Sequence, residues 1–117
     1  MIAVPEKRIL VADRDDIVLV LTRHVLIREG YAVDIASDTA MLDDLLRLNY
    51  YGSILVGVDL VGTDWLRALP PRMASRVIAI VSNGDGPLPV KTTIRKPLEL
   101  DALAAVVAKS IEDRQLE

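Results

Sequence analysis

Short aliphatic runs alternate with amphipathic segments along the whole chain. A run of apolar residues between polar flanks is typical of a buried parallel strand, whereas apolar residues three and four positions apart are typical of a covering helix. The expected strands are 9–12, 31–36, 53–58, 76–81 and 90–94, and the expected helices are 15–29, 38–48, 64–69 and a last helix after residue 97. This alternation predicts an α/β fold with a parallel sheet covered on both faces.

Polar and helix-breaking residues support these boundaries. Asp15 or Asp16 can cap the first helix, and Ser37 or Asp38 can cap the second. Pro70-Pro71 ends the third helix, while Pro97 suits the first turn of the last one. The link 83–89 is too short and too rich in Gly and Pro for a crossover helix, so it is expected to be tight or extended.

Length and composition narrow the class of protein. The 117 residues predict one domain over 1–115, with 116–117 set aside as a possible cloning remnant. There is no cysteine, so thiolate metal sites and disulfides are excluded. A net charge of −3 disfavours nucleic acid as a partner, and no apolar run is long enough for a membrane span. We therefore expect a cytoplasmic protein.

Small and polar residues stand at the ends of the expected strands. Asp13 follows the first strand, Gly57 and Asp59 lie at the end of the third, and Ser82 and Lys96 follow the fourth and fifth. Because the carboxyl ends of parallel strands meet at one edge of the sheet, functional groups of open α/β folds gather there. A site is therefore expected at this edge.

These residues, in this order and spacing, resemble the receiver domains of bacterial two-component response regulators. The resemblance covers nearly the whole chain and rests on segments 9–13, 62–64, 78–82 and 96–97. It implies a flavodoxin-like, doubly wound sheet of five strands in the order 2-1-3-4-5. The helix between strands 4 and 5 is expected to be shortened or missing, and Lys96-Pro97 is a candidate cis peptide bond.

The resemblance also implies roles for single residues. In such domains two adjacent acids and an acceptor aspartate hold Mg²⁺, while a hydroxyl and a lysine contact the phosphoryl group. Asp13 matches the first acid, Ser82 the hydroxyl and Lys96 the amine. Arg14 stands where the second acid is expected, and Gly57 stands where the acceptor is expected. No metal ion, cofactor or catalytic residue is therefore predicted.

Each of these residues also has a structural interpretation. Lys96 and Asp13 can form a structural ion pair, and Arg14 is expected to replace the metal by pairing with Asp13. Ser82 can simply end a buried strand. Asp59 is either a solvated loop or helix-capping acid, or a displaced phosphoryl acceptor.

The first helix carries more apolar residues than one buried face can hold. If Val18, Leu21 and Val25 face the sheet, Ile17, Leu19 and Ile27 remain near the surface. Exposed apolar clusters often mark a partner site. The receiver resemblance implies that this helix and the loop before the last helix meet the histidine-bearing helices of a kinase. The expected interaction face is thus Ile17, Leu19 and Ile27.

The predicted function is a pseudo-receiver that takes no phosphoryl group and acts by protein contact, in a hybrid histidine kinase or an atypical response regulator. The expected partner is a histidine kinase, another signalling domain or a second copy of the chain. Two alternatives stay open. One is binding of a cyclic dinucleotide by Arg72, Arg76, Arg95 and Lys96, and the other is phosphorylation of Asp59.

Overall fold

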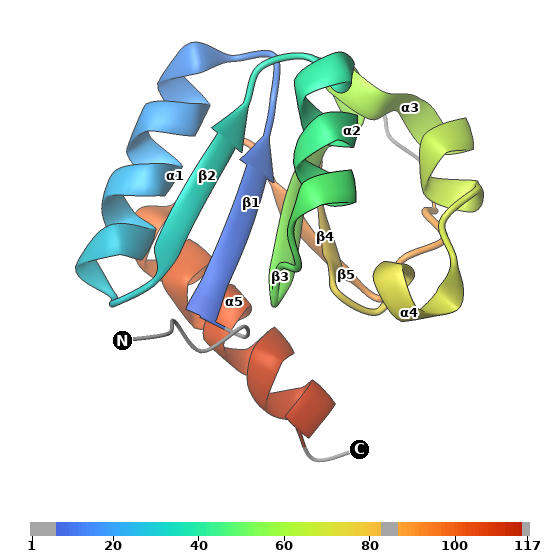
Figure 1. Ribbon diagram of the computed structural model, residues 1–117. Coiled ribbons are helices and arrows are strands. Elements are labelled where there is room, and N and C mark those ends of the chain that lie inside the picture. Colours follow the sequence, from blue (N-terminus) through green and yellow to red (C-terminus); the bar gives the residue numbers. More distant parts are fainter. Residues whose placement is uncertain (1–6, 83–86, 116–117) are drawn as a thin grey trace.

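The computed structural model describes residues 7–82 and 87–115, which form a twisted parallel sheet between two layers of helices (Figure 1). The strands are β1 (Arg8–Ala12), β2 (Ala32–Ala36), β3 (Ser53–Gly57), β4 (Val77–Val81) and β5 (Thr92–Arg95). All neighbours pair in parallel, in the order β2-β1-β3-β4-β5. The predicted flavodoxin-like fold and its strand order are confirmed.

Two groups of helices cover the two faces of the sheet. The helices are α1 (Asp16–Arg28), α2 (Thr39–Leu48), α3 (Val58–Arg67), α4 (Pro71–Ala74) and α5 (Leu100–Gln115). α1 and α5 pack on one face through Leu26 and Leu103, and α2 and α3 pack on the other through Leu42 and Leu66. β3 and β4 are buried along their whole length, as expected of central strands.

Aspartate side chains begin the two long N-terminal helices. The Asp15 carboxylate accepts a hydrogen bond from the backbone N–H of Ile17 at 2.9 Å, and Asp38 accepts one from Met41 at 2.7 Å. Each bond satisfies a backbone donor that the first helical turn leaves without a partner. Of the two pairs of candidate caps, the structure selects Asp15 and Asp38.

The segment after β3 differs from the prediction. The third strand was expected to reach residue 58 and the next helix to begin at residue 64, but α3 begins directly at Val58. Gly62 interrupts this helix with a φ of 77°, a conformation that glycine adopts without steric cost. Pro71 was expected only to end the third helix. In the structure it also begins α4, a helix of a single turn, because proline is tolerated in a first turn.

The structure describes Ser82 and 87–91 of the segment between β4 and β5, and these residues contain no helix. The first part of the predicted 83–89 link, 83–86, lies outside the described residues. β5 covers 92–95 instead of the expected 90–94. The Lys96-Pro97 bond is cis, as the receiver resemblance implied. Residues 116–117 also lie outside the described residues, and no helix within 7–82 or 87–115 is long and apolar enough to cross a membrane.

Tyr51 closes the core at the amino-terminal ends of the parallel strands, opposite the edge that their carboxyl ends form. Its ring is almost completely buried, and its hydroxyl donates to Asp34 at 2.6 Å. Arg8 forms an ion pair with the same carboxylate at 3.2 Å. Burial, with the neighbouring Asp34 carboxylate, raises the pKa of the Tyr51 hydroxyl well above its ordinary value. The phenol therefore stays neutral and keeps this bond throughout the physiological range.

Candidate functional site

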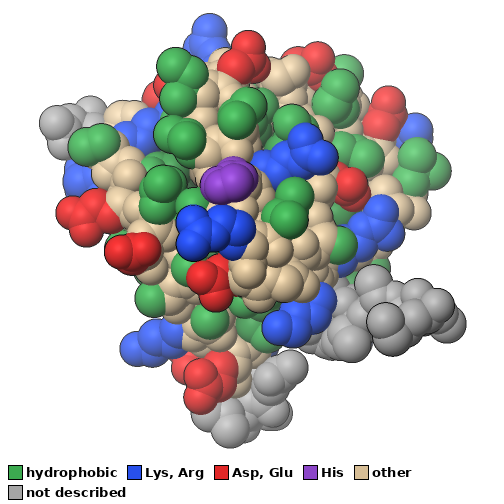
Figure 2. Space-filling model, turned by 90° about the vertical axis from the view of Figure 1, so that its left-hand side faces the viewer, with side chains coloured by type: hydrophobic (Ala, Val, Ile, Leu, Met, Phe, Trp, Pro, Cys, Tyr) green, Lys and Arg blue, Asp and Glu red, His purple; other side chains and the backbone are tan. Residues whose placement is uncertain are grey.

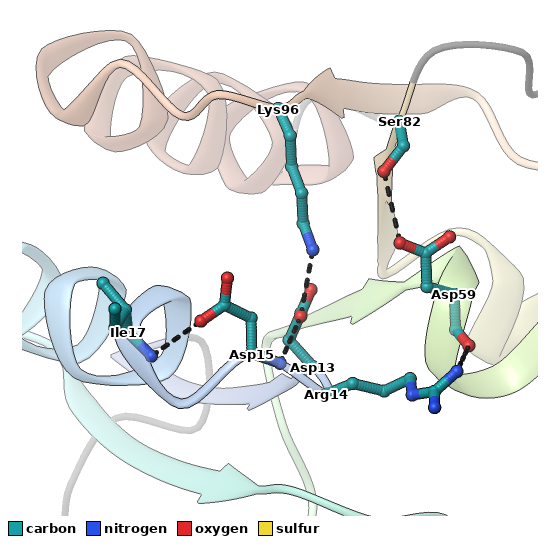
Figure 3. Close-up of polar contacts among 7 residues, drawn as sticks. All are labelled: Asp13, Arg14, Asp15, Ile17, Asp59, Ser82 and Lys96. Carbon is teal, nitrogen blue, oxygen red and sulfur yellow. Dashed lines mark hydrogen bonds and ion pairs between the residues drawn. The ribbon is translucent and has the colours of Figure 1, made fainter.

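The expected site residues do meet at the carboxyl edge of the sheet (Figure 3). The loops after β1 and β5 bring Asp13 and Lys96 together, and the first turn of α3 brings Asp59 beside Ser82. A cavity of about 400 Å³ opens between them, lined by Asp13, Arg14, Asp15, Asp59 and Lys96. Convergence of parallel strand ends therefore creates a pocket from residues up to 83 positions apart in the chain.

Asp13 lies at the base of this pocket and is completely buried. Its Oδ1 accepts hydrogen bonds from the backbone N–H of Asp15 at 2.9 Å and from Lys96 Nζ at 3.0 Å. Only 22% of the Lys96 side chain is exposed, so the ion pair is largely shielded from water. The contact ties the end of β1 to the loop after β5, as the structural interpretation of Lys96 expected.

The other oxygen of Asp13 occupies the space beside Gly57. Asp13 Oδ2 is buried and has no hydrogen-bond partner among the described residues. A Cβ atom built on Gly57 would overlap this oxygen and would lie 3.0 Å from Asp13 Cγ. The backbone of Gly57, with φ −71° and ψ 125°, is one that any residue can adopt. Of the nearest atoms, only those of the Asp13 side chain would have to shift to admit a Cβ atom at residue 57.

Arg14 does not pair with Asp13, so that prediction is wrong. Arg14 is exposed, and its Nη1 donates weakly to the backbone carbonyl of Asp59 at 3.5 Å. The Asp13 carboxylate points into the interior, where the ammonium of Lys96 reaches it and the guanidinium of Arg14 does not (Figure 3). The cation that neutralises Asp13 comes from a distant strand end instead of the next residue.

Asp59 lies in the first turn of α3, with its carboxylate at the pocket. Ser82 donates a hydrogen bond from Oγ to Asp59 Oδ2 at 3.2 Å. This bond links the end of β4 to α3, and an acid in a first helical turn is favoured by the helix dipole. The contact is compatible with both interpretations of Asp59, as a helix-stabilising acid and as a displaced acceptor.

The residues at the pocket do not fit the Mg²⁺ ion that receiver domains use. Magnesium requires several oxygen ligands in octahedral geometry. Here Asp13 Oδ1 is already shared by an ammonium and a backbone N–H, and two cationic side chains line the cavity. Within 7–82 and 87–115, no group of three or more acidic, histidine or cysteine side chains is placed to hold a metal ion.

The expected interaction face on α1 needs one correction. Leu19 is only 3% exposed and packs under the helix with Thr22, Val25 and Leu26. Val20 and Leu21 take its place at the surface, with exposed fractions of 62% and 45%. The prediction placed Leu21 toward the sheet and Leu19 outward, whereas packing against the sheet and α5 buries Leu19 and leaves Leu21 exposed.

Ile17 and Ile27 are exposed as expected, and the outer side of α1 dominates one face of the molecule (Figure 2). The single histidine of the chain, His24, lies among hydrophobic and basic side chains on this face.

A second cavity, of about 640 Å³, lies between α1 and the start of α5. We call it the groove; its lining is largely apolar and consists of Asp15, Val18, Leu21, Ser82, Lys96, Pro97, Leu98 and Leu100. Sequence reasoning named neither Leu98 nor Leu100 as part of a site. The receiver resemblance pointed only to the loop before the last helix, and both residues follow shortly after Lys96-Pro97, beside the same strand end as Lys96.

The four basic residues proposed for a cyclic dinucleotide do not form one patch. Arg72 and Arg76 precede β4, whereas Arg95 ends the parallel strand β5 and Lys96 follows it. The two pairs are therefore separated by the length of a strand, roughly 13–16 Å. Arg76 is also engaged locally, because its Nη1 donates to the Tyr51 carbonyl at 2.9 Å.

Comparisons with known proteins place this architecture among receiver domains. The fold is similar to a response regulator receiver domain protein from Clostridium thermocellum, with a TM-score of 0.77 and 22% identity over 93% of this chain and 97% of that one. It is also similar to one from Methanospirillum hungatei, with a TM-score of 0.78 and 21% identity over 92% and 95% of the two chains.

A third likeness is to the receiver domain of a signal transduction histidine kinase from Syntrophus aciditrophicus, with a TM-score of 0.79 and 19% identity over 91% and 90% of the two chains. No protein-family model matches the sequence, and the comparison with curated proteins finds no match. At this level of identity the likeness concerns the fold: the chain has the architecture of a response regulator receiver domain.

Proposed function

We propose that this domain is a pseudo-receiver of two-component signalling, which takes no phosphoryl group and acts through protein contacts. The observation that carries the proposal is the placement of Asp13 Oδ2 against Gly57. Residue 57 lies at the end of the central strand, where the receiver resemblance locates the acceptor. The space in which an acceptor side chain would begin is filled by the neighbouring carboxylate.

The chemistry of the pocket supports the same conclusion. Phosphoryl transfer to a receiver requires an oxygen nucleophile on a side chain, and glycine has none. It also relies on cationic groups that are available to the incoming phosphoryl oxygens. Lys96 is held by Asp13 at 3.0 Å, and the hydroxyl of Ser82 is directed to Asp59. The two groups that would contact a phosphate are each hydrogen-bonded to a carboxylate of the pocket.

Treatment with acetyl phosphate and Mg²⁺ is expected to leave the mass of the chain unchanged. A phosphorylated chain would gain about 80 Da, the mass of HPO₃, in intact mass spectrometry. A working receiver domain treated in parallel shows that the reagent is active. A gain that disappears in the Asp59→Asn variant would overturn the proposal and establish Asp59 as a displaced acceptor.

The groove offers a surface for the contact itself. Val18 and Leu21 of α1 line it together with Leu98 and Leu100, and Asp15 and Lys96 add charged groups to the lining. A largely apolar groove with a few charged groups suits an amphipathic helix from a partner. The proposed partner is the helical domain of a histidine kinase, with the present domain as part of a hybrid kinase or of an atypical response regulator.

The Leu100→Glu substitution is expected to abolish this contact. Leu100 is exposed in the first turn of α5, so the variant folds while it places a charge in the groove. The measurement is a two-hybrid screen of the domain against the histidine kinases of its own genome. Leu48→Glu is the matched control, because Leu48 is 72% exposed on α2, on the other side of the sheet. Equal binding by both variants would exclude the groove as the contact surface.

A further inference from the structure

A third cavity, of about 310 Å³, opens at the amino-terminal edge of the sheet, opposite the pocket. It lies between the end of α2 and the turn α4, which Figure 1 shows at this end of the strands. Leu46, Leu48 and Met73 give it apolar walls, and Tyr50 and Arg76 add an aromatic ring and a cation. The cavity thus combines a charged anchor with an apolar surface.

The guanidinium of Arg76 is held in one orientation by its neighbours. Its Nη1 donates to the Tyr51 carbonyl at 2.9 Å, and its Nε donates to the Arg72 carbonyl at 3.2 Å. The group also lies over the Tyr50 ring, 4.4 Å from the ring centroid. Two hydrogen bonds and a stacked ring position the planar fork in advance, so little side-chain entropy is lost when it binds a ligand.

Arg76 has no acidic partner among the residues that the structure describes. Its side chain is only partly exposed, and its hydrogen bonds go to neutral carbonyls, which compensate a positive charge less well than an anion does. Arg47, the other cation of the described lining, is already paired with Asp44 at 2.8 Å. Arg76 is therefore the cation of this cavity that is available to an anion.

We propose that the cavity binds a small carboxylic acid with a compact apolar body, such as a single ring. The carboxylate pairs with Arg76, and the body lies against Leu46, Leu48 and Met73. A monoanion matches one cation without an acidic partner, whereas a phosphate dianion calls for more than one. The cavity has the volume of about ten water molecules at roughly 30 Å³ each, so the ligand has about ten non-hydrogen atoms.

The inference goes beyond the proposed function, since this cavity shares none of its described lining residues with the pocket or the groove. The amino-terminal and carboxyl edges of the sheet are separated by the length of a strand, roughly 13–16 Å. Failure of the binding test would therefore leave the proposed function standing. Phosphorylation of Asp59 would likewise leave the binding test unaffected.

Phenylacetate, whose size matches this volume, is the probe. An NMR titration of the ¹⁵N-labelled 117-residue chain is expected to show saturable binding, with a Kd on the order of 1 mM for so small a ligand. The largest amide shifts should lie in segments 46–51 and 73–76. Acetate lacks the ring and phenylacetamide lacks the charge, so each should bind at least tenfold more weakly. Inorganic phosphate should also bind at least tenfold more weakly.

Two variants of Leu48 test the site without disturbing the core. Leu48 is 72% exposed, so both Leu48→Glu and Leu48→Gln should fold, which circular dichroism verifies. Leu48→Glu places a carboxylate of the chain at the cavity, where it competes for Arg76 and should weaken phenylacetate binding at least tenfold. Leu48→Gln has nearly the same shape without the charge, and its Kd should stay within about threefold of wild type.

Arg76→Lys separates the planar fork from the charge alone. Lysine keeps the positive charge but cannot pair with a carboxylate through two parallel hydrogen bonds, so binding should weaken about fivefold. The proposal is overturned if phenylacetate causes no saturable shifts up to about 20 mM, or if its largest shifts lie at the groove. It is also overturned if Leu48→Glu binds the probe as well as Leu48→Gln, if Arg76→Lys binds like wild type, or if acetate, phenylacetamide or phosphate binds as tightly as phenylacetate.

Discussion

The Gly57→Ala variant is expected to lose about 2–3 kcal/mol of stability, an unusually large effect for a glycine with an ordinary backbone conformation. Alanine is normally neutral or stabilising at such φ and ψ values. Here its methyl group would overlap Asp13 Oδ2, and this carboxylate is completely buried. To make room, Asp13 has to leave the Lys96 ammonium and the Asp15 amide. Urea denaturation followed by circular dichroism measures the loss.

A double-mutant cycle shows whether Asp13 is the cause. Asp13→Ala removes the oxygen that obstructs residue 57, so the second substitution should cost little once the first is present. The combined variant is then more stable than the sum of the two single losses predicts, by at least 1 kcal/mol. Strict additivity would mean that the two residues do not compete for space, and the structural basis of the proposed function would fail.

Lys96→Met is expected to destabilise the domain by about 3 kcal/mol, because it leaves the Asp13 carboxylate buried without its cation. Methionine retains most of the side-chain volume, so the loss reports on charge instead of packing. The Asp13→Asn/Lys96→Met double variant should regain much of this stability, since a neutral amide is less costly to bury than an unpaired charge. The midpoint of urea denaturation gives both values.

Arg47→Met is the control for this experiment. Arg47 pairs with Asp44 at 2.8 Å, but both side chains are mostly exposed. A surface pair of this kind contributes at most about 1 kcal/mol. If Lys96→Met costs no more than Arg47→Met, the Asp13–Lys96 pair is screened by water and does not hold the two strand ends together.

Two polar contacts from different strand ends hold the pocket together: the ion pair of Lys96 with Asp13 and the hydrogen bond from Ser82 to Asp59. A loop that is tied in this way has little freedom to respond to a ligand at the same place. We therefore propose that the domain acts through its surface, at the groove, instead of through a chemical event at the pocket.

Much of the fold could be predicted because its signals are local. The alternation of aliphatic runs with amphipathic segments was sufficient for the five strands and their parallel arrangement. The starts of α1 and α2 were predicted to within one residue, since a cap is a contact between near neighbours, as Asp15 with Ile17 shows. The last helix was expected to begin directly after residue 97, but α5 begins at Leu100. The segment after Gly57 was predicted less well, because α3 begins there without a side-chain cap and continues through the bend at Gly62.

The sequence by itself determined which groups reach the site: a glycine at the end of the central strand, and Asp13, Ser82 and Lys96 at the ends of the others. Only the tertiary structure decided how they pair: both Lys96 and Arg14 were expected to pair with Asp13, and only Lys96 does, because it reaches the buried carboxylate and Arg14 does not. It likewise decided that Leu19 is buried and Val20 exposed. Side-chain partners and helix rotation depend on contacts between distant segments, and a one-dimensional pattern does not contain them.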